Sequence, residues 1–221
     1  MNLTDFSPII ASILALLIAI IGHEIMHGWV AYKYGDSTAK SMGRLSLNPL
    51  VHIDPFGSIL VPLMTYFIPV LLGASSGFLF GWAKPVPVNM QTVLRNGGYN
   101  AAIQVSLAGI VYNLFSATLF SVILTSLYTP ETRDSFLILL ILSLVQINVI
   151  LAVLNLLPIP GFDGAHFVGY LALKFKLYKV AQFFAKAEPY GMIVIIIILM
   201  TPLKIPLIFW PTQMLLQLLL S

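Results

Sequence analysis

Residues 6–34 read FSPIIASILALLIAIIGHEIMHGWVAYKY, and this stretch fixes the class of the 221-residue chain. Residues 6–23 carry no Asp, Glu, Lys or Arg, and about 20 apolar residues in a helix cross the hydrocarbon of a bilayer. His23, Glu24 and His27 follow in the same helical run. Ionisable groups within a membrane helix are costly and by default indicate a functional site. The stretch therefore predicts a membrane-spanning helix that carries chemistry.

The composition extends this interpretation to the whole chain. Hydrophobic residues make up 59% and charged residues 9%, with a mean hydropathy of +0.96, whereas soluble domains have about 25% charged residues. The chain is therefore predicted to be an integral membrane protein. Its net charge of +3 comes from basic residues scattered between apolar runs, so no nucleic-acid partner is expected. The absence of Cys excludes disulfides, thiolate zinc sites, iron–sulfur clusters and a Cys nucleophile.

Runs without charged residues mark the candidate spans, in a single transmembrane domain over 1–221. No Lys or Arg precedes the first run, so we expect it to remain as an anchor rather than to be a cleaved signal. The last two runs are compatible with one kinked span or with a span followed by an interfacial segment. The runs are 6–23, 55–83, 96–130, 135–162, 189–203 and 205–221.

The run 55–83 differs from the others because it is rich in Pro and Gly. Both residues weaken a straight helix, so a re-entrant hairpin is expected rather than a span. The flanking polar segments, 37–54 and 81–89, include β-compatible pieces and predict small strands near the membrane surface. The Lys-containing segment 166–188 is predicted to be solvated or interfacial.

The spacing of the polar residues in the first helix is that of a metal site. On a helix, His23 and His27 lie one turn apart on one face, so that both imidazoles can reach one ion. Glu24 adjoins the first ligand, where a carboxylate can take and return protons of a metal-activated water. The alternative is a polar face that bonds neighbouring helices, but three ionisable groups at this spacing favour the metal site.

Two His ligands leave a tetrahedral zinc one protein ligand short. The best candidate for the third is Asp163, which follows a long apolar run in the sequence NLLPIPGFDGAH, residues 155–166. The Pro and Gly residues around it break the helix and allow the backbone to turn a carboxylate inward. The alternative is an Asp that ends a helix in water.

Five sequence blocks follow one another along residues 22–164. They are the HExxH heptad Gly22–Gly28, the connecting motifs GRLSLNPLVHIDPFG (43–57) and GWAKPVPVN (81–89), AGIVYN (108–113) and NLLPIPGFDG (155–164). With these blocks in this order, the chain resembles the site-2 proteases, which are intramembrane zinc metalloproteases. Gly161 and Phe162 in the last block, and Ala165 just after it, depart from the family's usual residues, and no segment resembles a PDZ or CBS domain.

The resemblance implies the roles of the site residues and the activity. By it, His23, His27 and Asp163 carry one Zn²⁺, Glu24 is the general base, and Asn113 and Asn155 line the substrate cleft. The implied fold is an all-α polytopic membrane protein, a site-2 protease-like helical core with a re-entrant segment and small membrane-associated β elements. The implied activity is hydrolysis of peptide bonds in or near transmembrane helices, so the expected partners are transmembrane protein substrates and the lipid bilayer.

Two further histidines and a second function stay open. His52 either approaches the metal cleft as an accessory residue or bonds a backbone carbonyl, and the structural role is favoured. His166 either orients Asp163 or lies in the headgroup layer, and the latter is favoured. The competing function is a membrane metal transporter that uses the same His/His/Asp cluster. Transport needs no general base, so Glu24 discriminates between the two functions.

The shared metal also predicts the topology. His27 and Asp163 must lie on one side of the membrane, so 56–80 dips and returns, 101–128 crosses outward and 136–160 crosses back. The positive-inside rule then places the active site of a multi-pass cell-membrane protein toward the cytoplasm. In this topology, two of the eleven basic residues, Arg133 and Lys204, lie on the outer side of the membrane. The nine assigned to the cytoplasmic side are Lys33, Lys40, Arg44, Lys84, Arg95, Lys174, Lys176, Lys179 and Lys186.

Overall fold

The computed structural model describes residues 6–61, 63–64, 68, 71, 73 and 83–221, which form helices and no β-strand. Within these described residues, four helical runs are long and apolar enough to cross a membrane: Ser7–Lys33, Met90–Leu127, Phe136–Leu156 and Tyr178–Met200. The chain is therefore an all-α polytopic membrane protein, as the sequence predicts. Its helices are α1 (Ser7–Lys33), α2 (Thr38–Ser41), η2 (Pro49–His52), η3 (Pro55–Leu60), α4 (Met90–Leu127), α5 (Phe136–Leu156), α6 (Asp163–Lys174), α7 (Tyr178–Ala187), η4 (Glu188–Tyr190), α8 (Gly191–Met200), η5 (Ile205–Phe209) and α9 (Trp210–Leu220).

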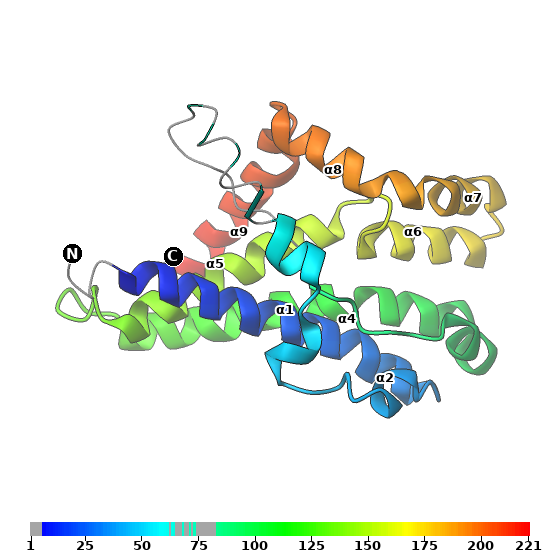
Figure 1. Cartoon of the computed structure of the whole chain (residues 1–221), viewed down its shortest axis with the longest axis horizontal. Helices are drawn as coiled ribbons and strands as arrows, with labels where there is room; N and C mark the ends of the chain where they lie inside the picture. The colour runs from blue at the N-terminus through cyan, green and yellow to red at the C-terminus, as the bar shows by residue number, and fades with distance from the viewer. Residues whose placement is uncertain (1–5, 62, 65–67, 69–70, 72, 74–82) are drawn as a thin grey trace.

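Helices α1, α4 and α5 form a bundle in which each packs against the other two (Figure 1). Helices α1 and α5 run in the same direction. The Ser12 and Ser143 hydroxyls near their starts lie 3.4 Å apart, and further along, Ala19 of α1 and Asn148 of α5 both contact Asn113. Helix α4 runs in the opposite direction between the same two ends. The three long helices thus alternate in direction along the chain.

A stripe of small side chains allows α1 to approach its neighbours closely. Ala11, Ala15 and Ala19 recur every fourth residue and are fully buried. Small residues at this spacing let membrane helices pack backbone to backbone. His23 and His27 continue the same four-residue spacing, so the face of α1 that packs the bundle also carries both imidazoles to its interior.

The end of α1 and the start of α4 lie together at one end of the bundle. The Asn96 side chain donates to the Tyr34 carbonyl at 2.8 Å, and the Asn89 N–H donates to Asp36 Oδ2 at 2.6 Å. The segment 37–88 therefore leaves and returns at the same end, as the predicted topology requires. The path of the re-entrant hairpin expected over 56–80 lies largely outside the described residues.

The expected small β elements are absent from the described residues of 37–54 and 83–89. The Asn48 and Asp54 side chains instead accept backbone N–H bonds and start short helical turns, η2 and η3. Residues 83–89 are extended, but Pro85 and Pro87 have no N–H to donate to a strand ladder. This segment is held by side chains and by one bond from the Lys84 N–H to the His52 carbonyl at 2.9 Å.

The C-terminal apolar runs, left open by the sequence, form two separate helices. Helix α8 ends at Met200, and α9 packs against α4 and α5 through Leu215, Leu216 and Leu219 on a cluster of Ala117, Val149 and Val153. The Lys-containing segment before them forms α6 and α7. Most side chains of α7 are exposed, and Ala181 is its buried residue.

Candidate metal centre

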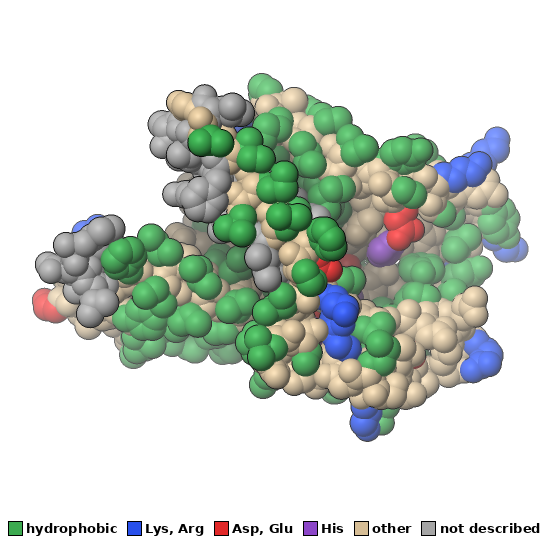
Figure 2. Space-filling model, in the orientation of Figure 1, with side chains coloured by type: hydrophobic (Ala, Val, Ile, Leu, Met, Phe, Trp, Pro, Cys, Tyr) green, Lys and Arg blue, Asp and Glu red, His purple; other side chains and the backbone are tan. Residues whose placement is uncertain are grey.

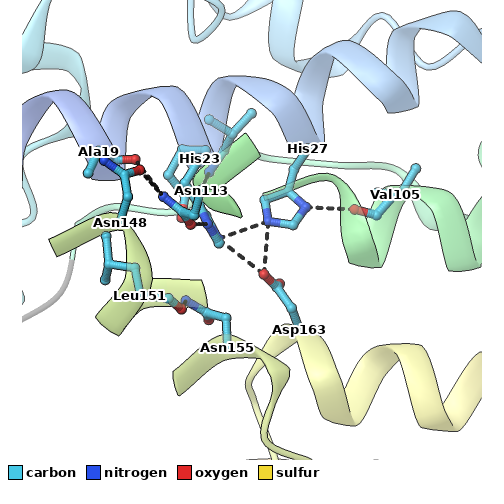
Figure 3. Close-up of polar contacts among 11 residues, drawn as sticks. Ala19, His23, His27, Val105, Asn113, Asn148, Leu151, Asn155 and Asp163 are labelled. Carbon is cyan, nitrogen blue, oxygen red and sulfur yellow. Dashed lines mark hydrogen bonds and ion pairs between the residues drawn. The ribbon is translucent and has the colours of Figure 1, made fainter. Parts of the chain in front are cut away.

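Three side chains from two distant parts of the chain converge at the centre of the described structure. His23 and His27 face the same way from consecutive turns of α1, with their Nε2 atoms 3.1 Å apart. Asp163 reaches them from the first residue of α6, and its Oδ2 lies 3.1 Å from His23 Nε2 and 3.2 Å from His27 Nε2 (Figure 3). The structure thus brings together the three ligands that the sequence predicts.

Asp163 arrives at this point because the chain breaks sharply after α5. The break contains Pro158, Pro160 and Gly161, and α6 begins at Asp163 itself. A side chain at Gly164 would overlap the carbonyl groups of Leu156 and Leu157, so α6 can begin this close to the end of α5 only with glycine there. The Asp-Gly pair therefore combines a ligand with the residue that lets it approach.

The three ligand atoms have the chemistry and the spacing of a metal site. Zinc bonds of about 2.0–2.2 Å at tetrahedral angles place neighbouring ligand atoms roughly 3.3–3.6 Å apart, slightly more than the 3.1–3.2 Å observed. Asp163 Oδ2 is buried and receives no hydrogen bond. Three atoms with lone pairs at this distance repel one another unless a metal cation or a shared proton lies between them. The residues present therefore fit a zinc ion with a fourth position open.

The second nitrogen of each imidazole has a partner of its own. His27 Nδ1 lies 2.7 Å from the Val105 carbonyl, and His23 Nδ1 lies 2.6 Å from Asn113 Oδ1. Both partners are acceptors, so both Nδ1 atoms carry the proton and both Nε2 lone pairs face the metal position. Such outer partners orient metal-binding histidines.

Glu24 lies beside the ligands on α1, and its carboxylate is tied to the segment 83–89. Its Oε2 accepts a hydrogen bond from the Val86 N–H at 2.8 Å. Arg44, which is buried, donates from Nη2 to the carbonyls of Lys84 at 2.8 Å and Pro85 at 3.2 Å. The two side chains hold this extended segment against the site.

The ligands open onto a cavity of about 630 Å³ that is also lined by Glu24, Val86, Asn155 and Phe162. Figure 2 shows a recess in this part of the molecule, with acidic and histidine side chains visible inside it. The remaining wall comes from the segment 83–90 and from α4, α6 and the start of α8. The cavity gives water and a polypeptide a route to the ligands.

The other predicted residues have different positions. Asn155 lines the cavity, whereas Asn113 is fully buried behind His23 and does not line it. His52 is buried away from the cavity, with its Nε2 2.8 Å from the Ser46 carbonyl, which matches the favoured structural role. His166 lies at the cavity wall, 3.6 Å from Glu188.

The sequence interpretation missed Asn148, Glu188 and the buried Arg44. Asn148 is fully buried and donates from Nδ2 to the Leu144 carbonyl at 2.8 Å, while its Oδ1 accepts from Asn113 Nδ2 at 2.8 Å. A signal was present in the sequence. Asn148 is an amide in a mostly apolar helix, seven residues and therefore two turns before Asn155, so the two amides share one face of α5.

Comparison with known proteins agrees with this geometry. The chain is 36% identical over 204 residues to "Putative zinc metalloprotease YwhC" of Bacillus subtilis, covering 90% of this chain and 84% of the relative. It is 30% identical over 188 residues to "Putative zinc metalloprotease Rip2" of Mycolicibacterium smegmatis, covering 84% of this chain and 65% of that relative. Rip2 of Mycobacterium tuberculosis H37Rv is 29% identical, with the same coverage. No model of a protein family and no solved structure matches.

Proposed function

The chain belongs to the site-2 protease family of zinc metalloproteases, and we propose that it hydrolyses peptide bonds within or near the transmembrane helices of other membrane proteins. The observation that carries the proposal is the convergence of His23, His27 and Asp163 on one point beside Glu24. Because α1 is apolar along its first four turns, this point lies within the membrane rather than in open solvent.

The depth of the site supports a substrate inside the bilayer. Glu24 lies 16 residues beyond Pro8, or roughly 24 Å along a helix that rises 1.5 Å per residue. The hydrocarbon core is about 30 Å thick, so the ligands lie inside it, nearer to the face where α1 ends. With the orientation predicted from the basic residues, this face is the cytoplasmic one of the cell membrane.

His23, His27 and Asp163 would hold the zinc, and Glu24 would move the protons. Bound zinc supplies Lewis acidity, which lowers the pKa of a water and polarises a substrate carbonyl. Glu24 then accepts a proton from the attacking water on a carboxylate oxygen and returns it to the leaving amine. Asn155 lines the same cavity, and the amide hydrogen that its bond to the Leu151 carbonyl does not use would donate to the substrate.

A helical substrate has to unwind before it is cut, because its carbonyls are held in i→i−4 bonds. We propose that the extended segment 83–88, which lines the cavity, captures the unwound stretch through main-chain hydrogen bonds. Arg44 and Glu24 hold this segment from one side. The Lys84 and Val86 N–H groups are already bonded and the two prolines have none, so the Val88 N–H and the carbonyls that Arg44 does not use are left for the substrate.

The direct test uses purified protein in detergent, one zinc per chain, and a peptide with a transmembrane sequence. We expect cleavage that a chelator abolishes and that added Zn²⁺ restores. Zinc movement across a reconstituted membrane without cleavage would instead support the transporter. Intact peptide in the presence of the zinc-loaded protein, under conditions where it binds, would contradict the proposed protease.

A further inference from the structure

A chain of buried amides connects His23 to the backbone of α5. His23 Nδ1 lies 2.6 Å from Asn113 Oδ1, and Asn113 Nδ2 lies 2.8 Å from Asn148 Oδ1 (Figure 3). Asn148 Nδ2 in turn lies 2.8 Å from the Leu144 carbonyl. Both Asn side chains have no exposed surface. Buried polar groups must be satisfied by one another, so the direction of each bond is constrained.

The direction follows from the last member of the chain. The Leu144 carbonyl can only accept, so Asn148 must turn its NH₂ group toward it. Asn148 then presents Oδ1 to Asn113, which must donate from Nδ2 and turn its own Oδ1 toward His23. His23 Nδ1 must therefore be the donor. With the proton on Nδ1, the Nε2 lone pair is free to bind a metal.

The proton of His27 is held on Nδ1 more directly. Its Nδ1 faces the Val105 carbonyl at 2.7 Å, and a carbonyl accepts only. Asn113, in contrast, is an amide that could be turned by 180°, and it would then offer N–H to His23 Nδ1. That arrangement would place the His23 proton on Nε2, where it blocks the metal. The Ala19 carbonyl, 3.5 Å from Asn113 Nδ2, is a longer and weaker restraint than Asn148.

We propose that Asn148 is a positioning residue that sets the His23 tautomer through Asn113 and so prepares the metal site before zinc arrives. The inference rests on the zinc site of the proposed function and adds a residue that touches neither ligand nor substrate. Outer partners of metal-binding histidines contribute about 10–100-fold to metal affinity. The same order of effect is expected when the restraint on Asn113 is lost.

Two substitutions of Asn148 separate positioning from simple packing. Asn148→Leu keeps the branched shape and the number of side-chain heavy atoms, although its methyl groups are bulkier, and it leaves Asn113 without its acceptor. Asn148→Asp, which is neutral when buried, keeps an oxygen for Asn113 and an O–H for the Leu144 carbonyl. Thr212→Val is the matched control, because Thr212 is also buried, on α9, and its hydroxyl has no hydrogen-bond partner. Asn148→Met replaces the Leu variant if that variant does not fold.

The first measurement is the zinc dissociation constant, obtained by competition with a chelating dye and without any substrate. We expect Asn148→Leu to weaken zinc binding by about 10–100-fold, with Asn148→Asp and Thr212→Val within about threefold of the native protein. Native affinity in Asn148→Leu overturns the proposal. An equal loss in all three variants also overturns it, because it would reflect general loosening of the bundle.

The second measurement reads the tautomer itself. In metal-free protein labelled with ¹⁵N-histidine, the ring nitrogen shifts report which nitrogen carries the proton. We expect His23 to be protonated at Nδ1 in the native protein and to populate both tautomers in Asn148→Leu, while His27 stays unchanged. An unchanged His23 tautomer in that variant overturns the proposal. This readout needs neither zinc nor proteolysis, so it stays informative if the proposed protease activity fails.

Discussion

The carboxylate of Glu24 on α1 accepts a hydrogen bond from the backbone N–H of Val86, which lies 62 residues further along the chain, at 2.8 Å. Val86 is itself buried, and its side chain packs where a Cβ on Gly28 would lie. The residue proposed to move protons is therefore fixed by a main-chain donor that no substitution of Val86 other than proline removes. This bond also attaches the proposed substrate-binding segment to the metal site.

Replacement of Glu24 by Gln should abolish hydrolysis while zinc remains bound. The Gln side-chain oxygen can still accept from the Val86 N–H, so the local structure is kept, but the group no longer takes a proton. General acid–base groups contribute about 10²–10⁴-fold, and we expect a loss of this size in peptide cleavage. Zinc content and thermal unfolding of the purified variant serve as controls. Full activity in Glu24→Gln would exclude Glu24 as the base.

Substrate capture by the segment 83–88 is best tested at Val88. Val86→Pro would also remove the donor to Glu24, so its effect would have two causes. Val88 lines the cavity, and no hydrogen bond of its N–H occurs in the described structure. We expect Val88→Pro to reduce cleavage at unchanged zinc affinity. Val88→Ala, which loses side-chain packing but keeps the N–H, should stay active, and equal activity of the two variants would argue against capture by the main chain.

Gly109 on α4 is required for the position of His23. A Cβ at this residue would overlap the imidazole ring of His23, and moving the ring away would stretch the bond between its Nδ1 and Asn113. Gly109→Ala should therefore weaken zinc binding by at least about tenfold, by analogy with the loss of an outer partner. Gly169→Ala is the control, since a Cβ there meets no atom within 4 Å. Equal zinc affinities in a competition assay would show that the bundle absorbs the extra methyl group.

The local part of the site was predictable because it depends on spacing alone. His23, Glu24 and His27 belong to one helix, whose geometry fixes their relative positions. Asp163 was predictable for a different reason, since its Pro- and Gly-rich surroundings indicate a break in a membrane helix. To bring the three ligands to one point, the segment between α1 and α4 must begin and end at the same end of the bundle. The contacts between residues 34–36 and 89–96 agree with this topology.

The missed features depend on how the helices are rotated in the bundle. Helix α5 is mostly apolar, and its few polar residues, such as Gln146 and Asn148, lie on different faces, so its sequence does not show which side faces α1 and α4. The burial of Asn113 behind His23, rather than in the cavity, follows from this rotation, as does its bond to Asn148. The small strands were predicted wrongly because β-compatible residues were weighed above the missing N–H groups of Pro85 and Pro87.

Asp36 should make the stability of the protein depend on pH. Burial alone would raise the pKa of this carboxyl, but hydrogen bonds from the Thr38 hydroxyl, the Thr38 N–H and the Asn89 N–H lower it below its usual value. A lowered pKa in the folded state stabilises the protein above the unfolded value of about 3.9, and this stabilisation is lost as the pH falls further.

Asp36→Asn should therefore lower the thermal unfolding temperature at pH 7. The expected decrease in the free energy of unfolding is about 1–3 kcal/mol, because hydrogen bonds to a charged group are lost. The difference from the native protein should shrink as the pH falls below about 4. Unfolding curves in detergent across pH 3–7 measure this directly. A difference that is constant over the whole range would show that the carboxylate charge does not contribute.

The topology can be tested by labelling, because the chain contains no Cys. Ser41, Gln91 and Glu131 are exposed and accept single Cys substitutions without loss of a contact at the metal site. Ser41 and Gln91 flank the segment that returns to the same end of the bundle, whereas Glu131 lies in the connection between α4 and α5 at the opposite end.

In intact cells treated with an impermeant maleimide, we expect only the Cys at position 131 to react, and all three to react after permeabilisation. Reaction at 91 but not at 41 would mean that the segment between them crosses the membrane. Reaction at 41 and 91 but not at 131 would place the metal site toward the outer face, against the excess of Lys and Arg at the end where α1 exits.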